Sequence, residues 1–151
     1  MTYTRQEMEE AFASYQAVAA KAAAANEWRA WADMFTDDAE YVEHHFGRFQ
    51  GREAIYEWIT TTMHTAPNDE MNAFPIEWYV VDEEKGWVVC KVQNRMRDPG
   101  DGSVHQEANW TLLKYAGNNH WSYEEDMYNP LEFGTMIKGW RAAVRAAGGS
   151  P

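Results

Sequence analysis

Apolar residues follow a helical period in the first half of the chain. They recur every three or four positions, so helices are expected over residues 4–25, 28–35 and 51–65. Residues 4–7 have the form of a capping box, and Asn26 separates the first two helices. The apolar faces of the three helices consist of Met8, Phe12, Tyr15 and Ala19, then Trp28, Trp31 and Phe35, then Ile55, Trp58, Ile59, Thr62 and Met63.

The hydrophobic period changes to two from residue 74 onward. Apolar and polar residues then alternate, and strands are expected over 74–80, 87–97, 104–115 and 120–128. One earlier strand is expected over 40–45. The turns between the last four strands are short and rich in Gly, Asn and Asp, so an antiparallel meander is expected. Asn129 and Pro130 then begin a final helix that ends near Gly148.

Composition predicts one globular domain over residues 1–151. The chain is 45% hydrophobic and shows no repeat or linker. A net charge of −11 argues against nucleic acid and anionic membranes as partners. The sequence shows no apolar run of membrane-spanning length and no signal-peptide pattern, so a cytoplasmic protein is expected. Cys90 is the lone cysteine and lies in a strand, which favours a buried structural thiol over a nucleophile.

Aromatic residues exceed what so small a core needs. Eight Trp, eight Tyr and six Phe make up 15% of the chain, which favours an aromatic-lined cavity. The five histidines lack the spacing of a metal site, so no metal ligand set is predicted.

Residues 31–59 carry a resemblance to a known fold. They read as a helix end, the turn Met34–Ala39, the strand Tyr41–His45, a glycine-containing loop and a second helix beginning at Gly51-Arg-Glu-Ala-Ile55. This order resembles the start of the nuclear-transport-factor-2-like α+β fold, especially its SnoaL-like and ketosteroid-isomerase-like branches. The resemblance implies a cone-shaped, curved, mostly antiparallel sheet, with three N-terminal helices packed on it, a C-terminal helix and a deep pocket. Homodimers are common among such proteins.

The strand after residue 40 offers candidates for acid/base chemistry. Residues two apart in a strand share a face, so Tyr41 and Glu43 point one way and His44 points the other. The resemblance implies a general-base carboxylate in this strand. Counting from Asp37–Ala39 puts Glu43 at that position, and counting back from Phe46–Gly47 puts His44 there. We favour Glu43, because this count also matches Tyr41 and Glu43 to a water-positioning pair in limonene epoxide hydrolases.

A second carboxylate is expected opposite Glu43. Asp126 in the last strand resembles an acidic residue of SnoaL-like cyclases and limonene epoxide hydrolases. Two carboxylates facing each other across a cavity divide acid and base roles, because one of them retains a proton. The alternatives are that Glu43 pairs with Arg48 or Arg52 at the rim, and that Asp126 belongs to a solvated acidic face.

Other positions both match and depart from the families that the chain resembles. Tyr15 resembles the oxyanion tyrosine of the isomerases in lying on the first helix. The epoxide hydrolases carry an Arg and an Asp where this chain has Val92 and Asn94, and the isomerases carry an Asp where it has Thr111. Steroid isomerisation and epoxide hydrolysis by those exact mechanisms are therefore not expected.

The predicted function is a pocket protein that needs no cofactor. We expect an acid/base enzyme of isomerase, cyclase, dehydratase or hydrolase type, acting on a small apolar polyketide-, terpenoid- or steroid-like molecule. Alternatives are a non-catalytic protein that binds a small hydrophobic ligand, and a dimer subunit whose cavity its own aromatics fill. The predicted catalytic residues are Glu43, Asp126, Tyr41, Tyr15 and His44, and the predicted ligand contacts are Trp28, Trp31, Trp58, His64, Asn94, Asn109, Trp110 and Tyr128. A homodimer is expected, paired through an outer sheet face with Trp87, Lys91, Gln93 and Arg95.

Overall fold

The computed structural model describes residues 2–151 and has the expected α+β order of elements. These are α1 (Arg5–Ala25), α2 (Arg29–Ala32), β1 (Phe35–Glu43), β2 (Gly47–Gln50), α3 (Arg52–Met63), a 3-10 turn (Asn68–Glu70), β3 (Met71–Ala73), β4 (Ile76–Asp82), β5 (Trp87–Met96), β6 (Gln106–Gly117), β7 (His120–Met127) and α4 (Pro130–Ala146).

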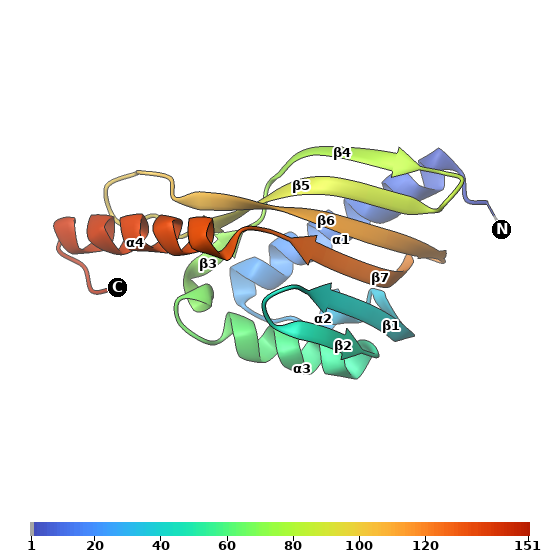
Figure 1. Cartoon of the computed structure of the whole chain (residues 1–151), viewed down its shortest axis with the longest axis horizontal. Coiled ribbons are helices and arrows are strands. Elements are labelled where there is room, and N and C mark those ends of the chain that lie inside the picture. The colour runs from blue at the N-terminus through green and yellow to red at the C-terminus, as the bar shows by residue number, and fades with distance from the viewer. Residues whose placement is uncertain (1) are drawn as a thin grey trace.

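The seven strands form one curved sheet in the order β2-β1-β7-β6-β5-β3, with β4 also paired to β5. The predicted antiparallel meander of β4 to β7 is confirmed. β1 enters the sheet parallel to β7, so the first and last strands of the chain are neighbours. Helices α1 to α3 cover one side of the sheet, and α4 extends from the end of β7 (Figure 1).

Local signals place the helix ends as expected. The Thr4 hydroxyl accepts a hydrogen bond from the Glu7 amide at 3.1 Å, which starts α1. Asn26 ends α1 in a left-handed conformation, with φ of 51°. At α4, the Asn129 side chain accepts from the Leu131 amide at 3.0 Å, and Pro130 occupies the first turn.

The segment between residues 33 and 50 differs from the prediction. β1 begins at Phe35 rather than at residue 40, and the predicted loop contains β2. Trp31 and Phe35 do touch, with ring centroids 4.9 Å apart, but across the junction from α2 to β1. A spacing of four residues therefore did not distinguish a continuing helix from a helix followed by a strand.

The core lies between the helices and the inner face of the sheet. Its largest fully buried side chains include Trp121, Trp140, Phe12 and Phe35. Cys90 is also buried there, and burial raises the pKa of its thiol, as expected for a structural cysteine. Within residues 2–151, no helix is long and apolar enough to cross a membrane.

Candidate functional site

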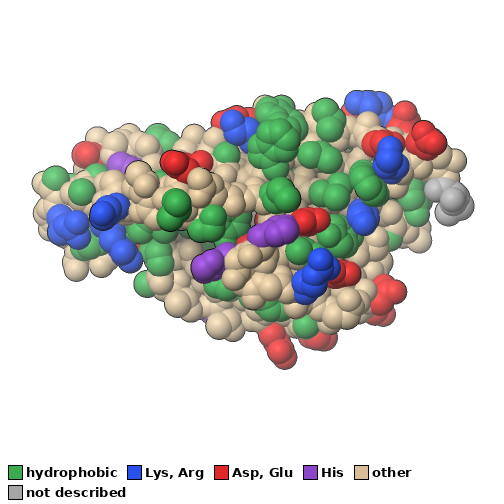
Figure 2. Space-filling model, viewed as in Figure 1, with side chains coloured by type: hydrophobic (Ala, Val, Ile, Leu, Met, Phe, Trp, Pro, Cys, Tyr) green, Lys and Arg blue, Asp and Glu red, His purple; other side chains and the backbone are tan. Residues whose placement is uncertain are grey.

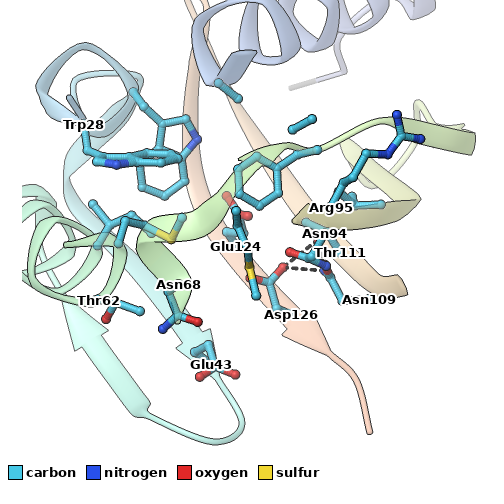
Figure 3. Close-up of a pocket in the computed structure, with 18 of the residues that line it drawn as sticks. Trp28, Glu43, Thr62, Asn68, Asn94, Arg95, Asn109, Thr111, Glu124 and Asp126 are labelled. Atoms are coloured by element: carbon cyan, nitrogen blue, oxygen red, sulfur yellow. Dashed lines mark hydrogen bonds between the residues drawn. The ribbon is translucent and has the colours of Figure 1, made fainter. Parts of the chain in front are cut away.

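A cavity of about 500 Å³ opens between the sheet and the helices. Figure 3 shows Glu124 and Asp126 in its middle, with Trp28 on one side and Asn94 and Asn109 on the other. The wall is mostly aromatic and aliphatic, and includes Trp28, Trp31, Trp58, Phe46, Phe74, Phe133, Ile59, Met63, Met71, Ile76 and Val92. This size and lining suit a small, largely apolar molecule.

The polar floor of the cavity is set by the parallel pairing of β1 and β7. Tyr41 lies opposite Glu124, and Glu43 lies opposite Asp126 in the strand register. Since alternate residues of a strand share a face, this register directs all four side chains into the cavity. Residues about 85 positions apart in sequence thus form one polar group.

Glu124 is 3% exposed and is held by two tyrosines. The Tyr15 hydroxyl on α1 lies 2.9 Å from both carboxylate oxygens, and the Tyr41 hydroxyl oxygen lies 3.2 Å from Oε1. Burial and the neighbouring charge of Asp126 raise the pKa of Glu124 well above its usual value, although the tyrosine hydrogen bonds oppose this. Glu124 therefore retains a proton at pH values where an exposed glutamate has lost it.

Asp126 is surrounded by neutral donors. Tyr41 donates to Oδ2, while Thr111 and Asn109 donate to Oδ1 at 2.6 and 3.1 Å. Asn94 in turn donates to the side-chain oxygen of Asn109 at 2.7 Å, which orients that amide. Burial raises the pKa of Asp126 to about 6, against the opposing effect of the hydrogen bonds. Asp126 is thus ionised at neutral pH and remains more basic than an exposed aspartate.

Glu43 lines the cavity and is 4% exposed. Its two oxygens accept the backbone amides of His45 and Phe46 at 3.2 and 2.9 Å, so the carboxylate closes the turn between β1 and β2. The alternative of an ion pair at the rim is wrong, because Arg48 pairs with Glu40 and Arg52 pairs with Asp37. Burial, and then the neighbouring Glu43, raises the pKa of Tyr128, which also faces the cavity.

The cavity brings together most of the residues that the sequence predicted for it. Those that line it are Tyr15, Tyr41, Glu43, Asp126, Trp28, Trp31, Trp58, Asn94, Asn109 and Tyr128. The buried indole nitrogen of Trp58 has no hydrogen-bond partner within residues 2–151.

Three predicted residues lie outside the cavity. His44 lies on the opposite face of the sheet, where its Nε2 is 2.6 Å from Glu125, so Glu43 rather than His44 faces the cavity. The Nε2 of His64, the residue that ends α3, lies 2.8 Å from the carbonyl oxygen of Asn26 at the end of α1, so this contact joins the ends of the two helices outside the pocket. Trp110 is 56% exposed, because it lies on the outer face of β6 between the inward-facing Asn109 and Thr111.

Sequence reasoning missed two residues of the polar floor. Glu124 was not proposed as a site residue, and Thr111 was considered only as a departure from the isomerases. The signal for both was available, since Glu124 lies two residues before Asp126 in β7. Arg95, which the sequence placed on the outer sheet face, also borders the cavity.

The comparisons with known proteins agree with this architecture. The model of a SnoaL-like domain matches residues 5–146. The chain belongs to the SnoaL-like family. No curated protein sequence matches this SnoaL-like chain. Within residues 2–151, no three His, Cys, Asp or Glu side chains are placed to hold a metal ion.

Solved structures share the SnoaL-like fold at low sequence identity. A hypothetical protein with a ketosteroid-isomerase-like fold from Catenulispora acidiphila, in complex with trimethylamine, is 22% identical with a TM-score of 0.59, over 76% of this chain and 85% of that one. An epoxide hydrolase of the limonene type from M. tuberculosis has a TM-score of 0.68 at 11% identity, over 93% and 96%. A putative isomerase from Bacillus subtilis has a TM-score of 0.67 at 14% identity, over 89% and 94%.

Proposed function

We propose that this SnoaL-like chain is a cofactor-independent enzyme that moves protons on a small, largely apolar molecule. The observation that carries the proposal is the hydrogen-bonded series of Tyr15, Glu124, Tyr41 and Asp126 in an apolar cavity. Two carboxyl groups with unequal proton affinity in one site are the usual basis for dividing acid and base roles. The structural relatives described as an isomerase and an epoxide hydrolase belong to reaction classes of this kind.

Asp126 is the proposed base. Its pKa of about 6 leaves it ionised at neutral pH, yet it binds a proton more tightly than an exposed aspartate. A carboxylate offers about four acceptor sites, and the three donors on Asp126 leave one for a substrate proton. Asn94 and Asn109 hold the carboxylate in place, and Tyr128 borders the same space.

Glu124 is the proposed acid, and the two tyrosines are the proposed hydroxyl donors. The proton that Glu124 retains can be given to a substrate oxygen directly or through Tyr15 or Tyr41, which contact it. Burial and the neighbouring carboxylates raise the pKa of both hydroxyls, so they remain neutral donors. In an isomerisation, Asp126 would remove a proton beside a carbonyl, the hydroxyls would stabilise the enol oxygen, and Asp126 would return the proton to another carbon. A cyclase, dehydratase or hydrolase reaction would use the same groups.

Hydrogen exchange at carbon tests the step that isomerase, cyclase and dehydratase reactions share. The protein would be incubated in D₂O with cyclic ketones of polyketide, terpenoid and steroid type, and deuterium uptake beside the carbonyl followed by NMR. We expect uptake above the buffer rate with at least one ketone, and a loss of about 10²-fold or more in Asp126→Asn.

Glu125→Gln is the matched control for this experiment. It removes a carboxylate from the adjacent position of β7, but on the outer face beside His44, so exchange should continue at the wild-type rate. Exchange that never exceeds the buffer rate, or that Asp126→Asn leaves unchanged, would favour the non-catalytic binding protein. The open cavity argues against the third alternative, in which aromatic side chains fill the space.

A homodimer is the second part of the proposal, and exposed apolar side chains on the sheet support it. Figure 2 shows hydrophobic side chains gathered over the middle of the sheet. The outer surface includes Trp78, Trp110 and Met127, with exposures of 37%, 56% and 57%, and the two tryptophan rings meet edge to face at 5.1 Å. Exposed apolar groups of this size are typical of protein interfaces. Trp110 lies opposite Lys91 in the strand register, so these side chains adjoin the surface expected from sequence.

A further inference from the structure

The charged groups of the cavity are mostly of one sign. Its lining includes three carboxylates, those of Glu43, Glu124 and Asp126, and one cation, Arg95. Arg95 donates through Nε to Gln106 at 2.8 Å, and Figure 3 shows it directed away from Glu124 and Asp126. Within residues 2–151, no Lys, Arg or His forms an ion pair with any of the three carboxylates.

Aromatic rings surround the same space. Trp28 meets Trp31 at 5.8 Å and Phe74 at 6.2 Å, with interplanar angles of 85° and 75°, so these rings present faces in different directions. Trp31 is also next to Tyr15 and Tyr41, the two residues that bind Glu124. Ring faces attract cations, and several rings around one space are the usual site for ammonium groups.

These two features together define a ligand class. We infer that the preferred ligand is an organic cation, an ammonium group on an apolar body, with its nitrogen beside Glu124 and Asp126 and its carbon atoms against the tryptophans. A neutral ligand would expel water from Asp126 without bringing a positive charge to the carboxylate. An ammonium group brings that positive charge. Anionic ligands are disfavoured by the charge of the Asp126 carboxylate. The inference rests on the proposed function in taking the cavity as the substrate site.

Proton binding adds an independent consequence. A bound ammonium group stabilises the ionised form of Asp126, so binding should release a proton where Asp126 still carries one, and should strengthen as the pH rises through about 6. The other groups facing Glu124 and Asp126 are Tyr15, Tyr41, Tyr128, Cys90, Arg95 and Glu43. The pKa values of the tyrosines and the thiol are raised, so these groups remain protonated near neutral pH, and arginine remains charged. The change between about pH 5 and pH 8 therefore reports on the carboxylates.

Choline and 3,3-dimethylbutan-1-ol form a matched pair of probes, because the alcohol has a neutral carbon atom where choline has its charged nitrogen. Their affinities would be measured from the tryptophan indole NMR signals at about pH 5 and about pH 8. At the higher pH we expect choline to bind about tenfold more tightly than the alcohol, with most of this preference lost at the lower pH. Calorimetry in buffers of different ionisation enthalpy should show protons released on choline binding.

Variants identify the side chain that produces the preference for choline. Asp126→Asn should reduce the preference for choline over the alcohol several-fold, whereas Glu84→Gln, at an exposed turn, should keep it. An alcohol that binds as tightly as choline would overturn the inference while leaving the cavity as a ligand site. Failure of both probes to move the indole signals would also overturn it, and the deuterium-exchange experiment would still judge the proposed function separately. The pH series uses the wild-type protein, so it decides even if a variant does not fold.

Discussion

The hydroxyl of Tyr15 lies 2.9 Å from both carboxylate oxygens of Glu124, although the two residues are 109 positions apart. Tyr15 comes from α1 and Glu124 from β7, so this contact joins the first helix to the last strand. It satisfies a carboxyl group that is almost completely buried, and it therefore serves both the stability of the fold and the chemistry of the cavity.

Tyr15→Phe removes this donor without changing the size of the ring. Because Glu124 is left with one tyrosine partner, we expect a loss of about 2 kcal/mol in the free energy of unfolding, measured with urea at neutral pH. Tyr79→Phe is the matched control, since this ring is 41% exposed, and it should change stability by less than about 0.5 kcal/mol. Equal effects of the two substitutions would contradict a structural role for the contact.

Asp126→Asn should alter how stability depends on pH. Folding raises the pKa of Asp126 from 3.8 to about 6, so the ionised form opposes folding. The contribution of protonated Asp126 to the stability of the fold is fully present below pH 3.8 and is lost as the pH rises through about 6. The shift corresponds to about 3 kcal/mol, and solvent screening at the open cavity reduces this to about 1–2 kcal/mol.

Urea titrations across this pH range measure the effect. The difference in stability between wild type and Asp126→Asn should move in favour of the variant as the pH rises from about 4 to 7. Asp69→Asn, at an exposed position, should follow the wild-type curve. Parallel curves for wild type and Asp126→Asn would show that folding does not raise the pKa of this carboxylate.

Glu43→Gln tests the turn between β1 and β2. An amide offers one acceptor oxygen where the carboxylate offers two, so one of the amides of His45 and Phe46 loses its partner. We expect a cost of about 1 kcal/mol and faster amide exchange at residues 45 and 46 by NMR. Unchanged exchange at these two amides would mean that the carboxylate does not hold the turn.

Trp110→Glu tests the proposed dimer. A charge at this exposed position of β6 would be desolvated in an interface, so the sedimentation coefficient should fall to that of a monomer of 17.5 kDa. Val104→Glu is the control, because Val104 is 60% exposed in the loop before β6 and lies outside the proposed surface. A wild-type protein that already sediments as a monomer at micromolar concentration would refute the dimer.

Cys90 should resist thiol reagents in the native protein. It is 1% exposed, and burial together with Glu124 and Asp126 raises the pKa of its thiol, so little thiolate forms. We expect a rate of reaction with a disulfide reagent at least about 10²-fold lower in buffer than in urea. A comparable rate in both would place the thiol at an accessible position.

Residue periodicity predicted the elements well, because helices and strands impose their periods locally. The meander of β4 to β7 followed from short turns, and the inward positions of Asp126, Asn94 and Asn109 agree with a period of two. The fit of Tyr15 into the same group depended on the resemblance rather than on its own spacing.

The errors concern long-range contacts. No local pattern indicated that β1 would pair parallel to β7, and this pairing decides that Glu124 joins Tyr41. The orientations of His64 and Trp110 depend on how the helix ends and on the face of the strand, and neither side chain enters the cavity.

The parallel pairing of β1 with β7 also has a consequence for synthesis of the chain. One edge of β1 bonds to β2, but its other edge has no strand to join until residue 127 has been made. During translation this edge and the apolar faces of α1 and α3 are therefore exposed at the same time, a combination that promotes association between nascent chains. The floor of the cavity is completed last, so a ribosome-bound fragment ending before β7 would lack both Glu124 and Asp126 and should depend on chaperones for solubility.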